Sequence, residues 1–142
     1  ASIAWFFQHE SSQREKSFFI PKILSILKKS ILDKNYKSSV NNLNFYNDWG
    51  SAEEFMEIIF KIVKKKLNSD FVVGTGKTHH AGEFVDKLFK QYDLNYKKHI
   101  IEKSRVKKSF EYSADISKLK KELKCFPVKN VYKVCGDIIK NL

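Results

Sequence analysis

The sequence predicts an α/β fold, because stretches of helical periodicity alternate with short apolar runs that are typical of strands. The chain has 142 residues, of which 42% are apolar and 14% aromatic, which is enough to bury a core and argues against a disordered chain. Five Gly and two Pro are too few for a collagen-like or turn-dense all-β chain. We therefore expect residues 1–142 to form a single unit without an internal repeat or linker.

The chain is strongly basic, with a formal net charge of +11 and 25 lysines against only two arginines. A basic surface attracts phosphate groups of any kind. Sequence-specific nucleic-acid readers rely on arginine, however, because its planar fork pairs with guanine and phosphate. The composition therefore favours a lysine-coated surface that serves an anionic small ligand over a nucleic-acid interface.

Hydropathy and cysteine content give two further expectations. No apolar run approaches the roughly 20 residues that cross a bilayer, so we expect no membrane partner. The two cysteines, Cys125 and Cys135, lack metal-ligand spacing. Two free thiols are typical of a reducing, cytoplasmic location.

The first third of the chain predicts a strand, a helix and a second short strand. Ile3–Phe7 is apolar and aromatic, as in a strand that is buried on both faces, and polar residues 8–12 break it. Helical spacing then runs from Ser17 to about Lys29, with a proline in the first turn. Residues 33–42 are polar and loop-like, and residues 43–46 alternate as a short strand does.

The middle of the chain contains the strongest element, a helix from Ala52 to about Lys66. Ser51 and Glu54 have the spacing of a capping box at its start. Phe71–Val73 follows as a buried strand and leads into a glycine loop, Gly74–Gly76.

The last third predicts a helix from about Ala81 to Gln91, a strand over Tyr96–Ile101, a short helix over Asp115–Leu123 and a final helix over Val131–Leu142. Three or four strands are few for a complete doubly wound sheet. We therefore expect a fragment of a larger protein, or a domain that docks on another.

A phosphate-binding loop is the first motif to test, since Gly74–Thr78 lies between a predicted strand and a predicted helix. The full motif requires a glycine five residues before Gly76, where this chain has Phe71. The loop is too short to wrap a triphosphate, so it does not predict a nucleoside triphosphatase. His79 and His80 follow without supporting carboxylate or cysteine spacing, so we predict polar loop residues there and no metal site.

Four motifs stand in the order and spacing of a known family. The chain reads F-Q-H-E-S-S-Q-R over Phe7–Arg14 and N-D-W-G-S-A over Asn47–Ala52, where the family reads F-N-H-E-S-P-R-R and R-D-W-G-H-A. It reads F-V-V-G-T-G-K-T-H-H-A-G-E-F-V over Phe71–Val85, where the family reads F-V-I-A-T-G and then T-H-S-V-R-E-F-V. Ala114–Pro127 is similar to the family's G-D-P-T-K-A-x-x-x-L-G-W-x-P. Over nearly its whole length the chain resembles the C-terminal part of GDP-mannose 4,6-dehydratases, which are extended short-chain dehydrogenase/reductases.

The resemblance implies the C-terminal, substrate-binding part of a Rossmann-type fold, with few short strands and packed helices. It implies a reaction in which NADP oxidises a nucleotide sugar at carbon 4, water is eliminated across carbons 5 and 6, and the hydride returns to carbon 6. GDP-mannose or a relative would be the substrate, and the full-length enzyme would be a homo-oligomer.

The resemblance also assigns residues. His9 and Arg14 match the family's cofactor-binding positions, and an arginine beside a cofactor phosphate is sensible chemistry. On the substrate side the matching positions are Gln8, Lys22, Asn47 and Arg105.

Two of these positions depart from the family, since Gln8 replaces an asparagine and Asn47 an arginine. The substitutions widen the expected substrate from GDP-mannose to nucleotide sugars as a class. Asp48, Trp49 and Gly50 are expected to hold the corner between a strand and a helix rather than to touch a ligand.

The catalytic half of such an enzyme is not in this sequence. No tyrosine is followed four residues later by a lysine, and no glycine-rich strand–turn–helix for a dinucleotide occurs. We therefore expect a lobe that is inactive alone. The alternative is a stand-alone basic module that binds nucleic acid or another phosphate-bearing partner.

Overall fold

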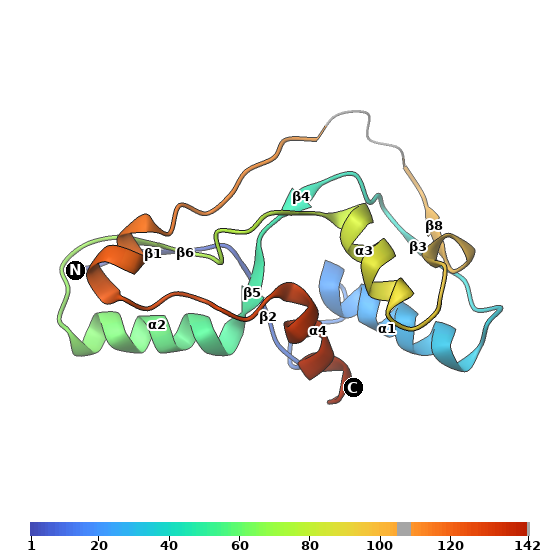
Figure 1. Ribbon diagram of the computed structural model, residues 1–142, viewed down its shortest axis with the longest axis horizontal. Helices are drawn as coiled ribbons and strands as arrows, with labels where there is room; N and C mark the ends of the chain where they lie inside the picture. Colours follow the sequence, from blue (N-terminus) through green and yellow to red (C-terminus); the bar gives the residue numbers. More distant parts are fainter. Residues whose placement is uncertain (105–108, 142) are drawn as a thin grey trace.

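The computed structural model describes residues 1–104 and 109–141, and its elements form two groups along the long axis (Figure 1). The first group packs a helix and a short helical turn against a pair of strands. Its members are β1 (Ala4–Phe6), β6 (Phe71–Val73), α2 (Ala52–Lys64) and η2 (Leu119–Leu123). A buried core of aromatic and aliphatic side chains, which includes Phe55, Phe71 and Leu119, holds this group together.

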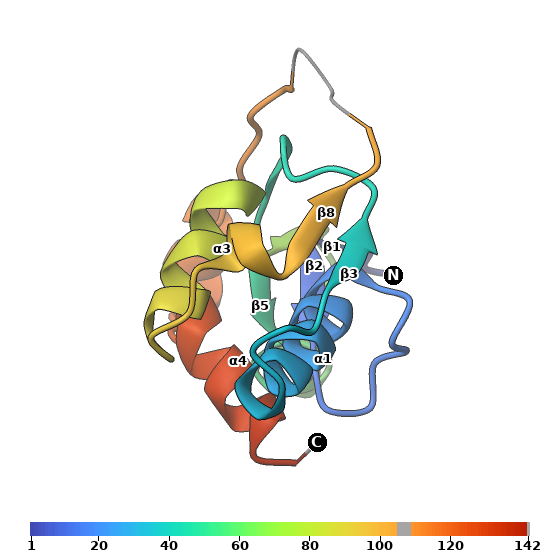
Figure 2. The same ribbon diagram turned by 90° about the vertical axis from the view of Figure 1, so that its right-hand side faces the viewer.

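The second group is mainly helical and lies at the opposite end of the molecule (Figures 1 and 2). It consists of α1 (Phe19–Leu32), α3 (Ala81–Lys90), α4 (Val131–Ile139), the 3₁₀ turn η1 (Tyr96–Lys98) and the strands β3 (Ser38–Val40) and β8 (Ile100–Glu102). The apolar faces of the three α-helices meet in a second core around Trp49 and Phe84.

One parallel strand pair lies within the first group, and a second connects it to the other group. β1 runs parallel to β6, with Phe6 opposite Val73, and β2 (Gln8–Glu10) runs parallel to β5 (Trp49–Ser51). A third pair is antiparallel and consists of the two-residue strands β4 (Tyr46–Asn47) and β7 (His79–His80), which precede β5 and α3 in the chain. The chain therefore passes from the first group into the second through β2 and returns to α2 of the first group through β5.

The α/β class and the positions of the four α-helices agree with the sequence prediction, and so does β6. The short helix predicted over Asp115–Leu123 is present at its C-terminal end as η2, which Lys124 ends with a positive φ of 51°.

The prediction that strand Ile3–Phe7 is buried on both faces is wrong. Ile3 is 52% exposed and Trp5 60% exposed, because both side chains point to a face that the described residues leave open. Within the described residues β1 also pairs with β6 alone. Gln8–Glu10, predicted as a break, instead continues as β2 because β5 offers it a parallel partner.

Three local predictions are also wrong. The predicted strand over residues 43–46 begins only at Tyr46, since the Asn44 amide donates to the Asn42 side chain in a turn. The predicted strand from Tyr96 starts as the η1 turn, which Asn95 caps by accepting from the Lys97 amide. The expected capping box does not form, because Glu54 bonds elsewhere.

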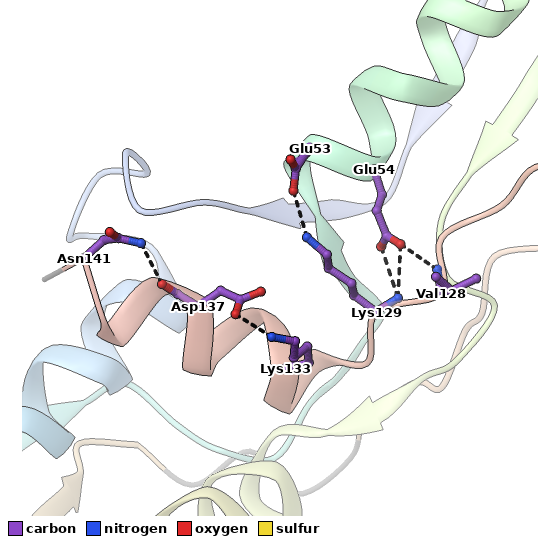
Figure 3. Close-up of polar contacts among 7 residues, drawn as sticks. All are labelled: Glu53, Glu54, Val128, Lys129, Lys133, Asp137 and Asn141. Carbon is purple, nitrogen blue, oxygen red and sulfur yellow. Dashed lines mark hydrogen bonds and ion pairs between the residues drawn. The ribbon is translucent and has the colours of Figure 1, made fainter.

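Glu54 accepts hydrogen bonds from the backbone amides of Val128 and Lys129, at 2.9 and 3.2 Å, instead of reaching back to the start of α2 (Figure 3). The carboxylate therefore ties the segment before α4 to the first turn of α2. Among the described residues, no helix is long and apolar enough to cross a membrane.

Candidate functional site

The parallel pairs place their carboxyl ends together, which is where ligands bind in open α/β sheets. β1 ends at Phe6 and leads into Gln8–Arg14, and β6 ends at Val73 and leads into the loop Gly74–Gly76. The Phe7 amide donates to the Val73 carbonyl at 2.9 Å, so the two exits are held side by side.

Arg14 is the most organised side chain at this edge. Its Nη1 donates to the His9 carbonyl and its Nη2 to Gln8 Oε1, both at 2.8 Å. Its Nε lies 3.4 Å from Glu10 Oε2, and its guanidinium stacks 3.9 Å from the centroid of the Phe18 ring. The guanidinium is thus held in place by its own strand and loop.

The remaining donors of Arg14 define what this group can bind. A guanidinium carries five N–H bonds, and within the described residues one on each of Nη1 and Nη2 makes no hydrogen bond. The side chain is 17% exposed, so a ligand can reach it. Two free N–H bonds in a fixed plane fit the oxygens of a phosphate or carboxylate.

His9 is positioned between aromatic rings rather than free in solvent. Its ring centroid lies 5.3 Å from those of Phe6 and Phe55, and its Nδ1 lies 3.1 Å from the Phe7 carbonyl. Opposite it in β5 stands Gly50, where an added Cβ would lie 2.5 Å from Phe55 Cε1. The position therefore requires glycine for the ring to pack beside His9.

Asp48 holds the neighbouring corner, as the sequence predicts. Its side chain is fully buried and accepts from the Thr75 amide, the Thr75 hydroxyl at 2.6 Å and the Gly76 amide at 2.9 Å. Trp49 is 2% exposed and belongs to the second core. The Asp48 carboxylate thus fixes the glycine loop against the start of β5.

Asn47 and Tyr112 form the other side of the site. The Tyr112 hydroxyl donates to Asn47 Oδ1 at 3.4 Å, and its ring centroid lies 5.8 Å from that of Phe7. A shallow hollow of about 350 Å³ opens beside them, lined by Asn42, Asn44, Phe45, Tyr46, Ser109, Phe110 and Tyr112.

The structure brings together three of the six residues singled out from the sequence. Gln8, His9 and Arg14 are in direct contact. Lys22 lies on the first turn of α1, where its amide donates to the carbonyl of Phe18, the residue under the Arg14 guanidinium. No side-chain contact joins Lys22 or Asn47 to that cluster among the described residues, and Arg105 lies outside them.

Two features of the site were not predicted. Tyr112 lies outside the four sequence motifs, and no local sequence pattern predicts its contact with Asn47. Glu10 lies within a motif, but a glutamate between polar residues is normally exposed, whereas this one is 3% exposed. Burial raises the pKa of Glu10 to about 7, and the lowering effect of Arg14 is the smaller of the two influences.

Comparison with known protein families agrees with the motifs. The family model described as GDP-mannose 4,6 dehydratase matches residues 1–140. The GDP-mannose 4,6 dehydratase of Dictyostelium discoideum is 33% identical over 88 residues, which is 62% of this chain and 25% of that protein. The human protein of the same name is 35% identical over 83 residues, or 58% of this chain and 22% of that protein.

Solved structures show the same fold at low sequence identity. RMD from Pseudomonas aeruginosa, complexed with NADPH, superposes with a TM-score of 0.81 at 12% identity, over 99% of this chain and 46% of that one. The dTDP-glucose 4,6-dehydratase of Bacillus anthracis, in complex with NAD, gives a TM-score of 0.77 at 15% identity, over 98% and 43%. The chain thus spans less than half of these structures and about a quarter of its curated relatives.

Proposed function

Because the chain belongs to the GDP-mannose 4,6-dehydratase family, we propose that it is the C-terminal, substrate-binding lobe of an NADP-dependent nucleotide-sugar 4,6-dehydratase. In this proposal residues 1–142 form one lobe, GDP-mannose or a related nucleotide sugar is the substrate, and a dinucleotide-binding half completes the enzyme. The lobe supplies positioning of cofactor and sugar, which contributes several kcal/mol when the geometry is right.

The observation that carries the proposal is the uncovered edge of β1. A strand with Trp5 60% exposed and Ile3 52% exposed is stabilised when another strand pairs with its free edge. Its residues read as an interior strand, although within the described residues β6 is its only neighbour. A sheet that continues past β1 would pair its free edge, and elements packed on the face of that larger sheet would cover Ile3 and Trp5, which point to the same face.

The roles of individual residues follow from the contacts. Arg14, with its two remaining N–H bonds, would hold a phosphate of NADP, and His9 lies beside it on β2. Gln8 is exposed and borders the substrate side, together with Lys22 and Asn47. We also assign Arg105 to the sugar-nucleotide diphosphate, on the family motif alone. The cofactor supplies hydride transfer, and these residues bind and orient.

The proposal is tested by supplying the missing half. The dinucleotide-binding domain of a family relative, such as the Dictyostelium protein, is expressed separately and mixed with this chain, and dehydration of GDP-mannose is followed with NADP present. Turnover is expected only in the mixture and is expected to fall at least tenfold with Arg14→Ala. Lys28→Ala, an exposed charge on α1, is the control for a general loss of basic charge. Turnover by the chain alone would refute the proposal.

A second candidate function is favoured by one feature of the surface. Lys34, Lys37, Lys97 and Lys98 surround an open hollow of about 450 Å³ near η1, and none of them forms an ion pair within the described residues. Unpaired lysines around a hollow bind phosphate-bearing polymers. In a salt titration, a steep loss of affinity for any polyanion, without preference for nucleotide sugars, would favour this basic module.

A further inference from the structure

Glu10 is a buried carboxylate that the proposed binding roles do not use. It is the last residue of β2, it stands opposite Ser51 of β5, and it is 3% exposed. Its Oε2 lies 3.4 Å from Arg14 Nε, yet neither atom has a hydrogen-bond partner in the part of the chain that the structure describes. A buried carboxylate oxygen without a donor is unfavourable in its ionised form.

Arg14 is the cation on which the charge of Glu10 depends. The other charged or titratable groups that face this region are His9 on β2, Glu53 at the start of α2, Lys129 before α4, and Cys135 and Asp137 on α4. Two of these acids form ion pairs with lysines: Lys129 Nζ lies 2.8 Å from Glu53, and Lys133 Nζ lies 2.8 Å from Asp137 (Figure 3). Within the described residues, Glu10 forms an ion pair with Arg14 alone.

A cavity gives solvent protons access to Glu10. It measures about 140 Å³ and is lined on one side by Glu10, Ser11, Ser12 and Ser51 and on the other by residues of α4 and Asn141. This volume holds several water molecules, and the serine hydroxyls can relay hydrogen bonds to the carboxylate. Burial already raises the pKa of Glu10 to about 7, so its charge changes in the neutral range.

We propose that Glu10 couples anion capture by Arg14 to the uptake of one proton. An anion on the two remaining N–H bonds of Arg14 competes with Glu10 for the positive charge and repels the carboxylate through a poorly screened interior. A proton taken from solvent through the cavity converts Glu10 to the neutral acid and removes that repulsion. The proposal rests on the proposed function only for the role of Arg14 as an anion-binding group.

The test uses the whole chain and inorganic sulfate, which stays a dianion across the neutral range and so does not itself titrate. Affinity is measured by calorimetry at about pH 6 and about pH 8. We expect sulfate to bind up to about tenfold more tightly at the lower pH. With a pKa of about 7, the neutral form of Glu10 falls from about nine-tenths to about one-tenth of the protein between these two pH values. At neutral pH, titrations in two buffers of different ionisation enthalpy should show proton uptake on binding.

Three variants identify the group that titrates. Glu10→Gln keeps the shape but not the charge, and its affinity should be independent of pH and close to that of the wild type at low pH. Glu53→Gln lines the same cavity and should keep the wild-type pH dependence. His9→Gln should also keep it; if it abolishes the dependence, the histidine is the titrating group and the proposal is wrong.

The remaining outcomes separate this inference from the proposed function. Sulfate binding that Arg14→Gln abolishes, but that shows neither pH dependence nor proton uptake, overturns the coupling and leaves Arg14 as an anion-binding group. Absence of any Arg14-dependent binding overturns both. If Glu10→Gln does not fold, the buffer titration of the wild type still decides, because no proton uptake at neutral pH contradicts the coupling.

Discussion

Asp48 is the residue whose replacement should destabilise the site most directly. Its carboxylate is fully buried and accepts from two backbone amides and one hydroxyl of Thr75 and Gly76. Asp48→Asn replaces one oxygen by an NH₂ group that faces a donor. At least one charge-assisted hydrogen bond is lost, which costs about 1.5–3 kcal/mol. With a urea slope of about 1–3 kcal/mol per molar, the unfolding midpoint should fall by about 1 M.

The assay is equilibrium unfolding in urea, followed by the fluorescence of Trp49, which is 2% exposed and directly follows Asp48. Asp70→Asn is the matched control, because Asp70 also accepts a backbone amide, that of Ile3, but at an exposed site. The control should change stability by less than about 0.5 kcal/mol. Equal midpoints for the two variants would refute the argument that the buried carboxylate holds the glycine loop.

Four further outcomes are expected. Folding raises the pKa of Glu10 from 4.5 to about 7, so near neutral pH the native state binds a proton that the unfolded state releases. The free energy of unfolding should therefore fall by about 1–3 kcal/mol between about pH 5 and pH 8. Urea midpoints measured against pH test this, and a flat profile would contradict it. Gly50→Ala places a Cβ 2.5 Å from the buried Phe55 ring and should cost about 1–3 kcal/mol. Gly136→Ala, at a position in α4 where an added Cβ would meet nothing within 4 Å, should instead stabilise by about 0.5–1 kcal/mol in the same urea titrations. Trp5 is 60% exposed, so Trp5→Ser should leave the stability of the isolated chain nearly unchanged. The same substitution should weaken the association of the chain with a dinucleotide-binding half in a pull-down. Unchanged association would show that β1 does not contact that half.

Elements with strong local signals could be predicted from the sequence. α2 and α3 carry apolar stripes at helical spacing, and β6 is a short apolar run next to a glycine loop, so both types appear close to their predicted bounds. Pairings between distant segments could not be predicted in the same way. β3 and β8 are joined across about 60 residues, and neither has an alternating pattern of its own.

Competition between local and distant partners explains the remaining differences. Ser51 and Glu54 have capping-box spacing, but the unpaired amides of Val128 and Lys129 lie within reach of Glu54 and take its oxygens. Glu10 is buried because β2 pairs with β5 beneath α4. This burial depends on distant segments and cannot be predicted from the residues next to Glu10. The motif residues therefore indicate where the site lies, whereas the charge state of the site depends on contacts that only the fold reveals.

The two halves of the site differ in how complete they are. Asp48 accepts hydrogen bonds from Thr75 and Gly76, and Arg14 donates two and pairs with Glu10, so both side chains are held before any ligand arrives. A preorganised guanidinium loses little side-chain entropy on binding a phosphate, which favours affinity. The edge of β1 that faces away from β6, in contrast, has no partner strand among the described residues. The anion-binding group of this chain is therefore positioned before a ligand binds, whereas the free edge of β1 leaves room for a further strand.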